Sequence, residues 1–301
     1  MLHKGEFLYD TATVISQGRR ERQEDAIVAD FPAGNSMGFV VLSDGMGGHH
    51  AGDVASKIVV TEVFSELKLQ SGDIREMEHK IGDILQNAMF GANDCVGIYS
   101  KECGTDAVMG ATLLVPVLIE NRLFWLSVGD SPLFLFRGEK LRRLNEDHAI
   151  GSQVEYLVSN GLMLRDEALN FPDQNCLTSV IVGDKIPQVD CSAAPVELLG
   201  EDILIVASDG LLVLSEDEIA ETIASAQNWP AADISTALMR RIEDVDDPFQ
   251  DNVSICVIKL KESGARPGFE TERNNANSSP NLARKKITLV ASVSRSAGAV
   301  G

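Results

Sequence analysis

The sequence predicts an α+β fold in which helices cover antiparallel sheet. Three features predict it: short apolar segments rich in Val, Ile, Leu and Phe, two consecutive stretches of helical period, and strand connections too short for a crossover helix. A chain of βαβ units would instead alternate single strands with single helices. We therefore expect helical layers packed on antiparallel sheet.

Several segments are expected as strands because they are short, apolar and rich in β-branched residues. They cover residues 26–31, 38–42, 111–120, 122–128, 133–137, 203–207 and 253–260. The three from 111 to 137 are joined by very short connections. This predicts neighbouring strands in an antiparallel part of the sheet.

Two amphipathic helices are expected between the second and third of these strands. Apolar residues recur at helical spacing over 54–67 and again over 77–92. Nearer the C-terminal end, Ser215 stands three residues before Glu218, a capping box that predicts a helix through about residue 226. Residues 234–242 have the period of a further helix.

The remaining stretches set the predicted domain boundaries. Residues 153–164 are weakly helical, and 165–175 read as an exposed excursion. After residue 260, Gly, Pro, Asn and Ser dominate and no period remains. We expect one domain over 1–260, followed by a disordered, weakly basic tail over 261–301.

The charge balance bears on the kind of partner. The 301 residues include 45 acidic and 26 basic side chains, for a net charge of -19. Residues 262–301 carry six basic and three acidic residues, net +3, so the body carries -22. Nucleic acid and anionic membrane both attract positive surfaces, so neither is expected as a partner.

The sequence also predicts where the protein resides. No apolar run approaches the ~20 residues that span a bilayer, and Lys4, Glu6 and Asp10 interrupt the N-terminus where a signal peptide would be apolar. The five cysteines include no C-x-x-C pair, which predicts neither a disulfide framework nor a structural zinc site. We expect a cytoplasmic protein.

Acidic residues recur at the ends of predicted strands. Two apolar strands run directly into Ser-Asp-Gly, which places Asp44-Gly45 and Asp209-Gly210 at strand ends. Another strand is followed by Asp130, and two more strands are preceded by Asp25 and Asp251. In antiparallel sheet, strand ends and strand starts share one edge, so these carboxylates are expected to converge. Converging carboxylates repel unless cations lie between them, which favours Mg²⁺ or Mn²⁺. Any one Asp-Gly, taken alone, is better explained as a tight turn.

A basic group precedes the first of these carboxylates. Arg19, Arg20 and Arg22 alternate with acidic residues up to Glu24 and Asp25. A guanidinium can hold two phosphate oxygens in its planar fork, which suits a site beside metal ions. The alternative is a solvated, charged turn.

A series of short motifs stands in order along the chain: Arg20-x-x-Gln23-Glu24-Asp25, VLSDGMGGH from Val41, GATLL from Gly110, SVGDS from Ser127, DHA from Asp147, ASDGLL from Ala207 and DNVS from Asp251. Together these motifs resemble those of the metal-dependent protein phosphatases, the type 2C serine/threonine family, in their bacterial form. They follow the family's order over about residues 10–260. The resemblance implies a four-layer α-β-β-α sandwich of two central antiparallel sheets flanked by helices, with the metal centre at one end.

The resemblance also implies roles for the matching residues. The two-metal centre, of Mn²⁺ or Mg²⁺, would be served by Asp25, Asp44, Asp209 and Asp251, with the carbonyl of Gly45 as a further ligand. Asp130, together with Asp209, matches a third, weaker metal site. Glu24 would act through a metal-bound water, and Arg20 would bind the substrate phosphate.

The implied activity is hydrolysis of phosphoserine and phosphothreonine in proteins by a hydroxide that bridges two ions. The expected partners are phosphorylated protein substrates and a cognate bacterial Ser/Thr kinase that the enzyme opposes in signalling, and we expect a monomer. The alternative is a catalytically weak family member that acts as a metal-binding regulatory or scaffold protein.

Three features bear on the mechanism and on other phosphatase folds. Met46 stands where animal members carry a histidine proposed as general acid, and Met cannot donate a proton. His49 and His50 are expected as exposed loop residues, and His148 as a structural one. The haloacid-type Asp-x-Asp nucleophile has no convincing counterpart, because the comparable pair, Asp244 and Asp246, ends a predicted helix.

Overall fold

The computed structural model describes residues 7–33, 35–47, 51–102, 109–174, 176–192 and 194–262. All of them belong to one compact unit, residues 1–265. The predicted tail lies outside the described residues from 263 onward, as do His49 and His50. The last described strand ends at Glu262, two residues past the predicted domain end.

The strands form two sheets. The first has the order β1-β12-β11-β7-β8 and the second the order β10-β6-β5-β3-β2, with β4 paired to β3 and β9 to β6. The strands of the first sheet are β1 (Phe7–Ser16), β7 (Leu133–Arg137), β8 (Lys140–Arg143), β11 (Ile203–Ala207) and β12 (Val253–Glu262). Those of the second are β2 (Asp25–Asp30), β3 (Met37–Gly47), β4 (Met109–Ala111), β5 (Leu113–Ile119), β6 (Arg122–Val128), β9 (Asp190–Cys191) and β10 (Val196–Glu197).

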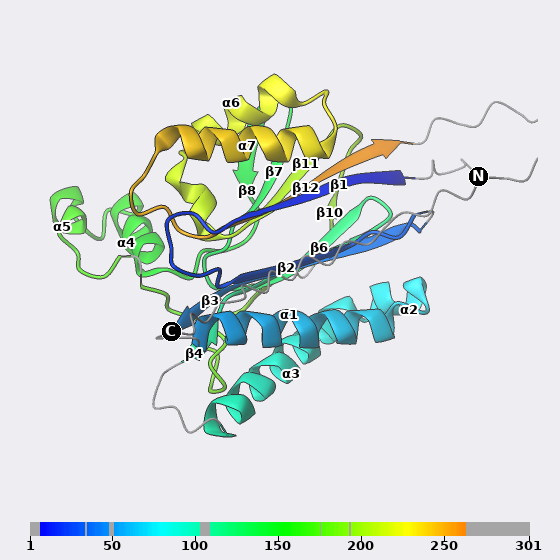
Figure 1. Ribbon diagram of the computed structural model, residues 1–301, viewed down its shortest axis with the longest axis horizontal. Coiled ribbons are helices and arrows are strands. Elements are labelled where there is room, and N and C mark those ends of the chain that lie inside the picture. The colour runs from blue at the N-terminus through cyan, green and yellow to red at the C-terminus, as the bar shows by residue number, and fades with distance from the viewer. Residues whose placement is uncertain are drawn as a thin grey trace, which may run out of the picture. The chain divides into compact units, whose positions relative to one another are not determined.

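Helices cover the outer face of each sheet, so the molecule has the predicted four layers (Figure 1). The second sheet carries α1 (Ala51–Gln70), α2 (Ile74–His79) and α3 (Ile81–Glu102), and the first carries α6 (Glu216–Ala226) and α7 (Ala231–Val245). The predicted capping box at Ser215 starts α6. Neighbouring strands pair antiparallel throughout the described ladders, which confirms the fold class.

One predicted pairing is wrong. The strands β5 and β6 pair as expected, but β7 pairs with β11 and β8 in the other sheet. The short connection Gly129–Pro132 carries the chain from one sheet to the other, because Gly129 adopts a φ of 107°, which side chains rarely allow. The strands β1 and β8 were also not predicted. Their sequences carry Asp10, Lys140, Arg142 and Arg143, which interrupt the apolar pattern of a strand.

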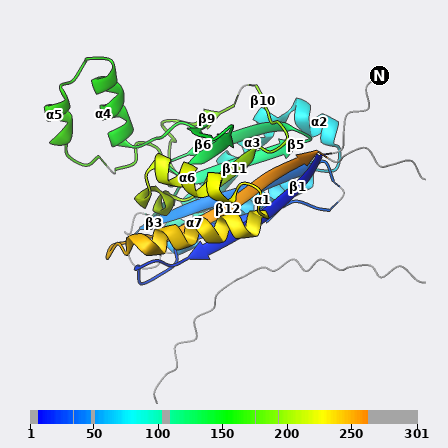
Figure 2. The same ribbon diagram turned by 90° about the horizontal axis from the view of Figure 1, so that it is seen from above.

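The excursion after the DHA motif contains more regular structure than predicted. It forms α4 (Ile150–Ser159) and α5 (Arg165–Leu169), which project from the sheets in both ribbon views (Figures 1 and 2). The side chains of Tyr156, Leu162 and Leu164 are 66%, 71% and 68% exposed. Within the predicted excursion, most of the described side chains of 165–174 are exposed as expected, although Ala168 is buried and residues 165–169 form a short helix.

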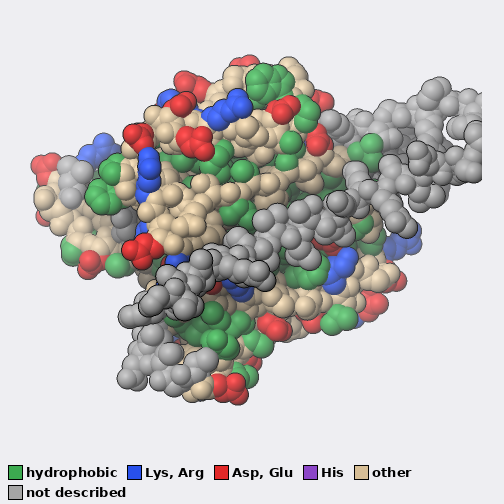
Figure 3. Space-filling model, viewed as in Figure 1, with side chains coloured by type: hydrophobic (Ala, Val, Ile, Leu, Met, Phe, Trp, Pro, Cys, Tyr) green, Lys and Arg blue, Asp and Glu red, His purple; other side chains and the backbone are tan. Residues whose placement is uncertain are grey.

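Charged side chains are spread over the surface. On the face seen in Figure 3, acidic side chains lie scattered over both helical layers with basic ones between them. Among the described residues, no helix is both long enough and apolar enough to cross a lipid bilayer.

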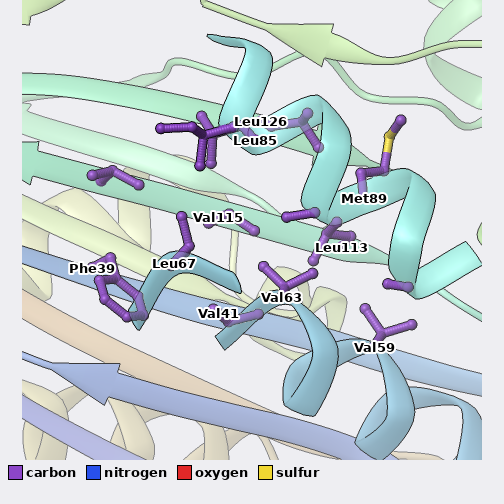
Figure 4. Packing of buried hydrophobic residues seen from close by; sticks show 14 of the residues in the cluster. Phe39, Val41, Val59, Val63, Leu67, Leu85, Met89, Leu113, Val115 and Leu126 are labelled. Carbon is purple, nitrogen blue, oxygen red and sulfur yellow. The ribbon is translucent and has the colours of Figure 1, made fainter. Parts of the chain in front are cut away.

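Three apolar clusters hold the layers together. One lies between the second sheet and its helices, one between the first sheet and its helices, and one between the sheets. In the first of these clusters, side chains of α1 and α3 pack on β3, β5 and β6; Figure 4 labels Val59, Val63, Leu67, Leu85, Met89, Phe39, Val41, Leu113, Val115 and Leu126. Each such fully buried side chain stabilises the fold by about 1.5–3 kcal/mol.

Candidate active site

Two of the predicted carboxylates face each other on neighbouring strands of the second sheet. Asp25 begins β2 and Asp44 lies in β3, and the two are direct partners in the antiparallel register. Thr112 fixes Asp44 from the other side: its hydroxyl accepts from the Asp44 N–H at 2.9 Å, and its N–H donates to the Asp44 carbonyl at 2.8 Å. The backbone of this pair is therefore held by strand hydrogen bonds on both sides.

Two further carboxylates come from the first sheet. Asp209 follows β11 at the start of a short 3₁₀ helix, η1 (Asp209–Val213), and Asp251 precedes β12, the strand paired with β11. Between them, the Ser208 hydroxyl donates to Asp25 Oδ2 at 2.7 Å and accepts from the Ser254 N–H at 2.9 Å. This hydrogen bond joins the two sheets, so the candidate site spans both.

Asp130 lies on the connection that passes between the sheets. A Cβ at Gly129 would lie 2.6 Å from a Thr112 methyl group, so glycine is required there. Arg143 donates to the Asp130 carbonyl at 2.6 Å, and Gly129 exchanges hydrogen bonds with His148, whose Nδ1 accepts from the Gly129 N–H at 3.1 Å. The buried His148 thus has the structural role expected from the sequence.

Glu24 and Gly45 lie where β2 and β3 meet the start of α1. The Gly45 N–H donates to the Glu24 carbonyl at 3.1 Å. A Cβ at Gly45 would lie 2.1 Å from the carbonyl oxygen of Gly52, in the first turn of α1. Only glycine allows the strand and the helix to approach so closely at this point.

Arg20 lies in the turn between β1 and β2, and its guanidinium donates to Asp251 Oδ2 at 2.5 Å. The amide side chains of Gln23 and Asn252 support this turn. Gln23 accepts from the Asp25 N–H at 3.0 Å, and Asn252 accepts from the Glu24 N–H at 2.7 Å. All eight predicted site residues therefore lie around one end of the sheets, the end at which the β1–β2 turn and the start of β12 meet in Figure 1.

Burial perturbs the acidity of the central carboxylates. Burial raises the pKa of Asp25 to about 7, although the hydrogen bond from Ser208 acts in the opposite direction and lowers this pKa. Burial is also the main cause that raises the pKa of Asp44 well above its ordinary value, and the charges of Asp25 and Asp209 add to this effect. Positive charge placed beside these side chains would favour their ionised forms.

The same effect extends to the other carboxylates. Burial first, and then the charge of Asp209, raises the pKa of Asp130 to about 7. Burial raises the pKa of Asp209, helped by the charge of Asp251. Burial likewise raises the pKa of Glu24, whereas Arg20 lowers it.

The donor set fits a hard divalent cation in its chemistry. Asp25 Oδ1 and Asp209 Oδ1 are both buried and have no hydrogen-bond partner among the described residues. Carboxylate oxygens are the ligands that Mg²⁺ and Mn²⁺ prefer, so an ion would satisfy both orphaned atoms. In the described part of the chain, no three His, Cys, Asp or Glu side chains are yet spaced as a closed ligand set.

The sequence reasoning missed the residues that hold these carboxylates in place. Ser208, Thr112 and Arg143 each contact the site through hydrogen bonds that depend on long-range pairing. The repeated Ser-Asp-Gly was the available signal for Ser208. Met46 is half-buried and pairs with Gly110 in β4. Its thioether carries no ionisable proton, so it cannot act as a general acid there.

Comparisons with known proteins bear on the identity of the site. The family model for protein phosphatase 2C matches residues 16–176. The chain is 30% identical over 238 residues to protein phosphatase PhpP of Streptococcus pneumoniae, which covers 77% of this chain and 89% of the relative.

Solved structures share the fold. The serine/threonine phosphatase PstP/Ppp of Mycobacterium tuberculosis matches with a TM-score of 0.69 and 25% identity, over 85% of this chain and 99% of that one. A catalytic domain of PstP, solved in complex with two manganese ions, matches with a TM-score of 0.65 and 24% identity over the same shares of the two chains.

Proposed function

Because this chain belongs to the protein phosphatase 2C family, we propose that its carboxylate cluster is a divalent-metal centre that hydrolyses phosphoserine and phosphothreonine in proteins. The chain is a serine/threonine protein phosphatase, as its relatives are. One observation supports the metal-dependent mechanism above all others. Carboxylates from two sheets meet at one edge, and Asp25 and Asp209 each present a buried oxygen that has no protein partner.

The residues that would hold two ions are Asp25, Asp44, Asp209 and Asp251, with the Gly45 carbonyl as a further ligand. Asp130 and Asp209 would hold a third ion more weakly. The manganese-bound PstP domain supports Mn²⁺ as one suitable ion. When bound, the ions would supply positive charge at the phosphate and make a water molecule acidic enough to attack phosphorus.

The side chains around the cluster would bind and orient the substrate. Arg20 lies at the exposed rim, where its planar fork can take two phosphate oxygens. Its present partner, Asp251, would turn to an ion, which frees the guanidinium for phosphate. Glu24 would orient the attacking water by hydrogen bonding, and its partial burial raises its pKa above the ordinary value, so it holds a proton more readily than a fully exposed glutamate.

The cellular role follows from this chemistry. An enzyme that removes phosphate from serine and threonine reverses the action of a Ser/Thr kinase, and we place this protein opposite such a kinase in bacterial signalling. We propose that it acts in the cytoplasm and as a monomer.

The direct test is an assay on a phosphothreonine peptide. We expect hydrolysis with Mn²⁺, none with chelator, and a loss of at least 10²-fold in kcat for Asp209→Ala, the scale of removing one preorganised electrostatic group. Equal rates in all three arms would contradict the proposal. Titration calorimetry that detects no Mn²⁺ binding would favour the regulatory or scaffold alternative.

A further inference from the structure

An aromatic side chain stands exposed at the rim of the candidate active site. Among the described residues, Phe249 is the most exposed large hydrophobic side chain, at 85%. It lies two residues before Asp251, and so within about 7 Å of chain from a proposed metal ligand. An exposed aromatic ring with this placement suggests contact with a partner.

The turn that carries Phe249 is held by hydrogen bonds at both ends. The Phe249 N–H donates to Asp247 Oδ1 at 2.9 Å, and the Gln250 N–H donates to the Asp247 carbonyl at 3.2 Å. Gln250 is buried, and its amide donates to the Gly210 carbonyl at 3.0 Å. The backbone that carries the ring is therefore held against the segment that begins at Asp209, so the position of Phe249 relative to the site is fixed by the turn.

Two more partly exposed apolar residues are close to this turn, Val245 four residues before Phe249 and Leu212 two residues after Gly210, which Gln250 contacts. Val245, the last residue of α7, is 41% exposed, and Leu212, on η1, is 39% exposed. We call Leu212, Val245 and Phe249 the rim patch. In Figure 1, the end of α7 and the start of β12 lie at the same end of the sheets as the β1–β2 turn, which carries Arg20. Arg20 and the turn are linked through Asp251.

We propose that the rim patch binds an apolar side chain of the phosphoprotein substrate, within about three residues of the phosphorylated one. The inference rests on the proposed function. A protein segment whose phosphate reaches Arg20 must cross the neighbouring surface, whereas a small phosphate ester need not. An extended segment advances about 3.3 Å per residue, so two or three residues span the short distance from Asp251 to Phe249. The rim patch then selects substrates by their sequence near the phosphate.

The test compares two phosphothreonine peptides that differ only in the three residues on either side of the phosphorylated one, Leu in one peptide and Gly in the other. We expect Phe249→Ala to raise KM for the Leu peptide roughly tenfold, the scale of losing one apolar contact. The Gly peptide and a small aryl phosphate should be unaffected, and Phe249→Leu should restore most of the loss. Trp229→Ala is the matched control, because Trp229 is 52% exposed but lies near Lys259, towards the far end of β12.

The outcomes separate this inference from the proposed function. If the wild-type protein hydrolyses none of the three substrates, the proposed function fails. Fluorescence anisotropy with a labelled Leu peptide that carries a non-hydrolysable phosphonate then tests the rim patch alone. An equal change for both peptides, or no change, overturns the docking proposal. A loss of activity on the aryl phosphate in Phe249→Ala would show that the turn only positions Asp251. A change in oligomeric state would assign the patch to a second copy of the chain. Either result overturns the docking proposal.

Discussion

Asp25 and Asp44 occupy opposed positions on neighbouring strands, where two charged carboxylates destabilise a sheet. The metal-free protein avoids this cost by keeping protons on them, because burial raises the pKa of both. The same burial leaves Asp25 Oδ1 without a protein partner. The pair is thus poorly suited to a metal-free protein at neutral pH and well suited to one that exchanges protons for cations.

This exchange predicts how stability depends on pH. In the folded, metal-free state Asp25 has a pKa of about 7, against an ordinary value of 3.8. Between these values the folded state binds more protons than the unfolded state, so the free energy of unfolding falls as pH rises and the stabilisation is lost through pH 7. In chelator, we expect the melting temperature to be roughly 5 °C lower at pH 8 than at pH 5.

The control for this prediction is Asp25→Asn, which cannot ionise and should show a smaller fall over the same range. Melting curves followed by circular dichroism provide the measurement. A melting temperature in chelator that rises steadily from pH 5 to pH 8 would contradict the burial argument.

Arg20 and Arg19 provide a matched pair of basic residues. Arg20 pairs with Asp251, a proposed metal ligand, whereas Arg19 pairs with Asp246, which has no proposed role in the metal centre, and both are largely exposed. We expect Arg20→Ala to lower kcat/KM for a phosphopeptide roughly 10²-fold, because charge-assisted, bidentate contacts to phosphate are lost. Arg19→Ala should change it less than threefold. Similar losses in steady-state kinetics for both variants would instead indicate a general effect of surface charge.

The individual site residues were predictable because they sit at strand ends, where local sequence and strand direction suffice. Asp44 and Asp209 each follow an apolar run, and antiparallel pairing places Asp44 opposite Asp25 in one sheet and β11 beside β12, which Asp251 precedes, in the other. The sequence predicted one shared sheet edge, whereas the packing of two sheets brings these pairs together. Ser208 and Thr112 were not predictable, because the role of Ser208 depends on how the two sheets pack together and that of Thr112 on which strand lies beside β3. The sequence around Ser208 or Thr112 does not indicate these long-range contacts.

At the scale of elements, the connection from β6 to β7 decides where Asp130 lies. Read locally, it looks like a tight hairpin, and the sequence therefore predicted one continuous meander. In the structure it passes between the sheets, and hydrogen bonds from Arg143 and to His148 hold it there. A short connection shows only that two strands lie close together, not that they belong to the same sheet. The hydrophobic pattern of β7 is compatible with either sheet.

The projecting helices α4 and α5 predict an effect on substrate choice. They lie at the same end of the molecule as the site and leave several large apolar side chains exposed (Figure 2). Replacing residues 165–175 with a short Gly/Ser linker should alter turnover of a phosphorylated protein severalfold and turnover of a small aryl phosphate far less. Steady-state rates on both substrates decide the matter, and an equal effect on both would count against the prediction.

At the scale of the whole molecule, the candidate site lies between two halves, each made of one sheet and the helices that cover it. Each sheet has its own helices and its own apolar cluster, and the third cluster lies between the sheets. Asp25 and Asp44 come from one half, and Asp209 and Asp251 from the other. Ions bound among them would therefore tie the halves together.

This predicts that metal stabilises the whole fold. An ion at 100 times its dissociation constant contributes about 2.7 kcal/mol. We expect saturating Mn²⁺ at pH 7.5 to raise the melting temperature by roughly 5–10 °C relative to chelator. Asp209→Ala should lose most of this shift, and differential scanning calorimetry measures it. An undiminished shift in that variant would mean that the stabilising ions bind elsewhere.

The pairing of β1 with β12 has a consequence for how the enzyme is made. The two strands run side by side over their whole length, from Phe7 opposite Glu262 to Ser16 opposite Val253. During translation β1 is synthesised early and β12 late. The strand β1 therefore has no β12 to pair with until almost all the residues between them have been synthesised. Asp251 arrives only with β12. With Asp251 as a metal ligand, as we propose, a nascent chain has no complete metal centre until its domain is nearly synthesised, and we expect it not to dephosphorylate other proteins before then.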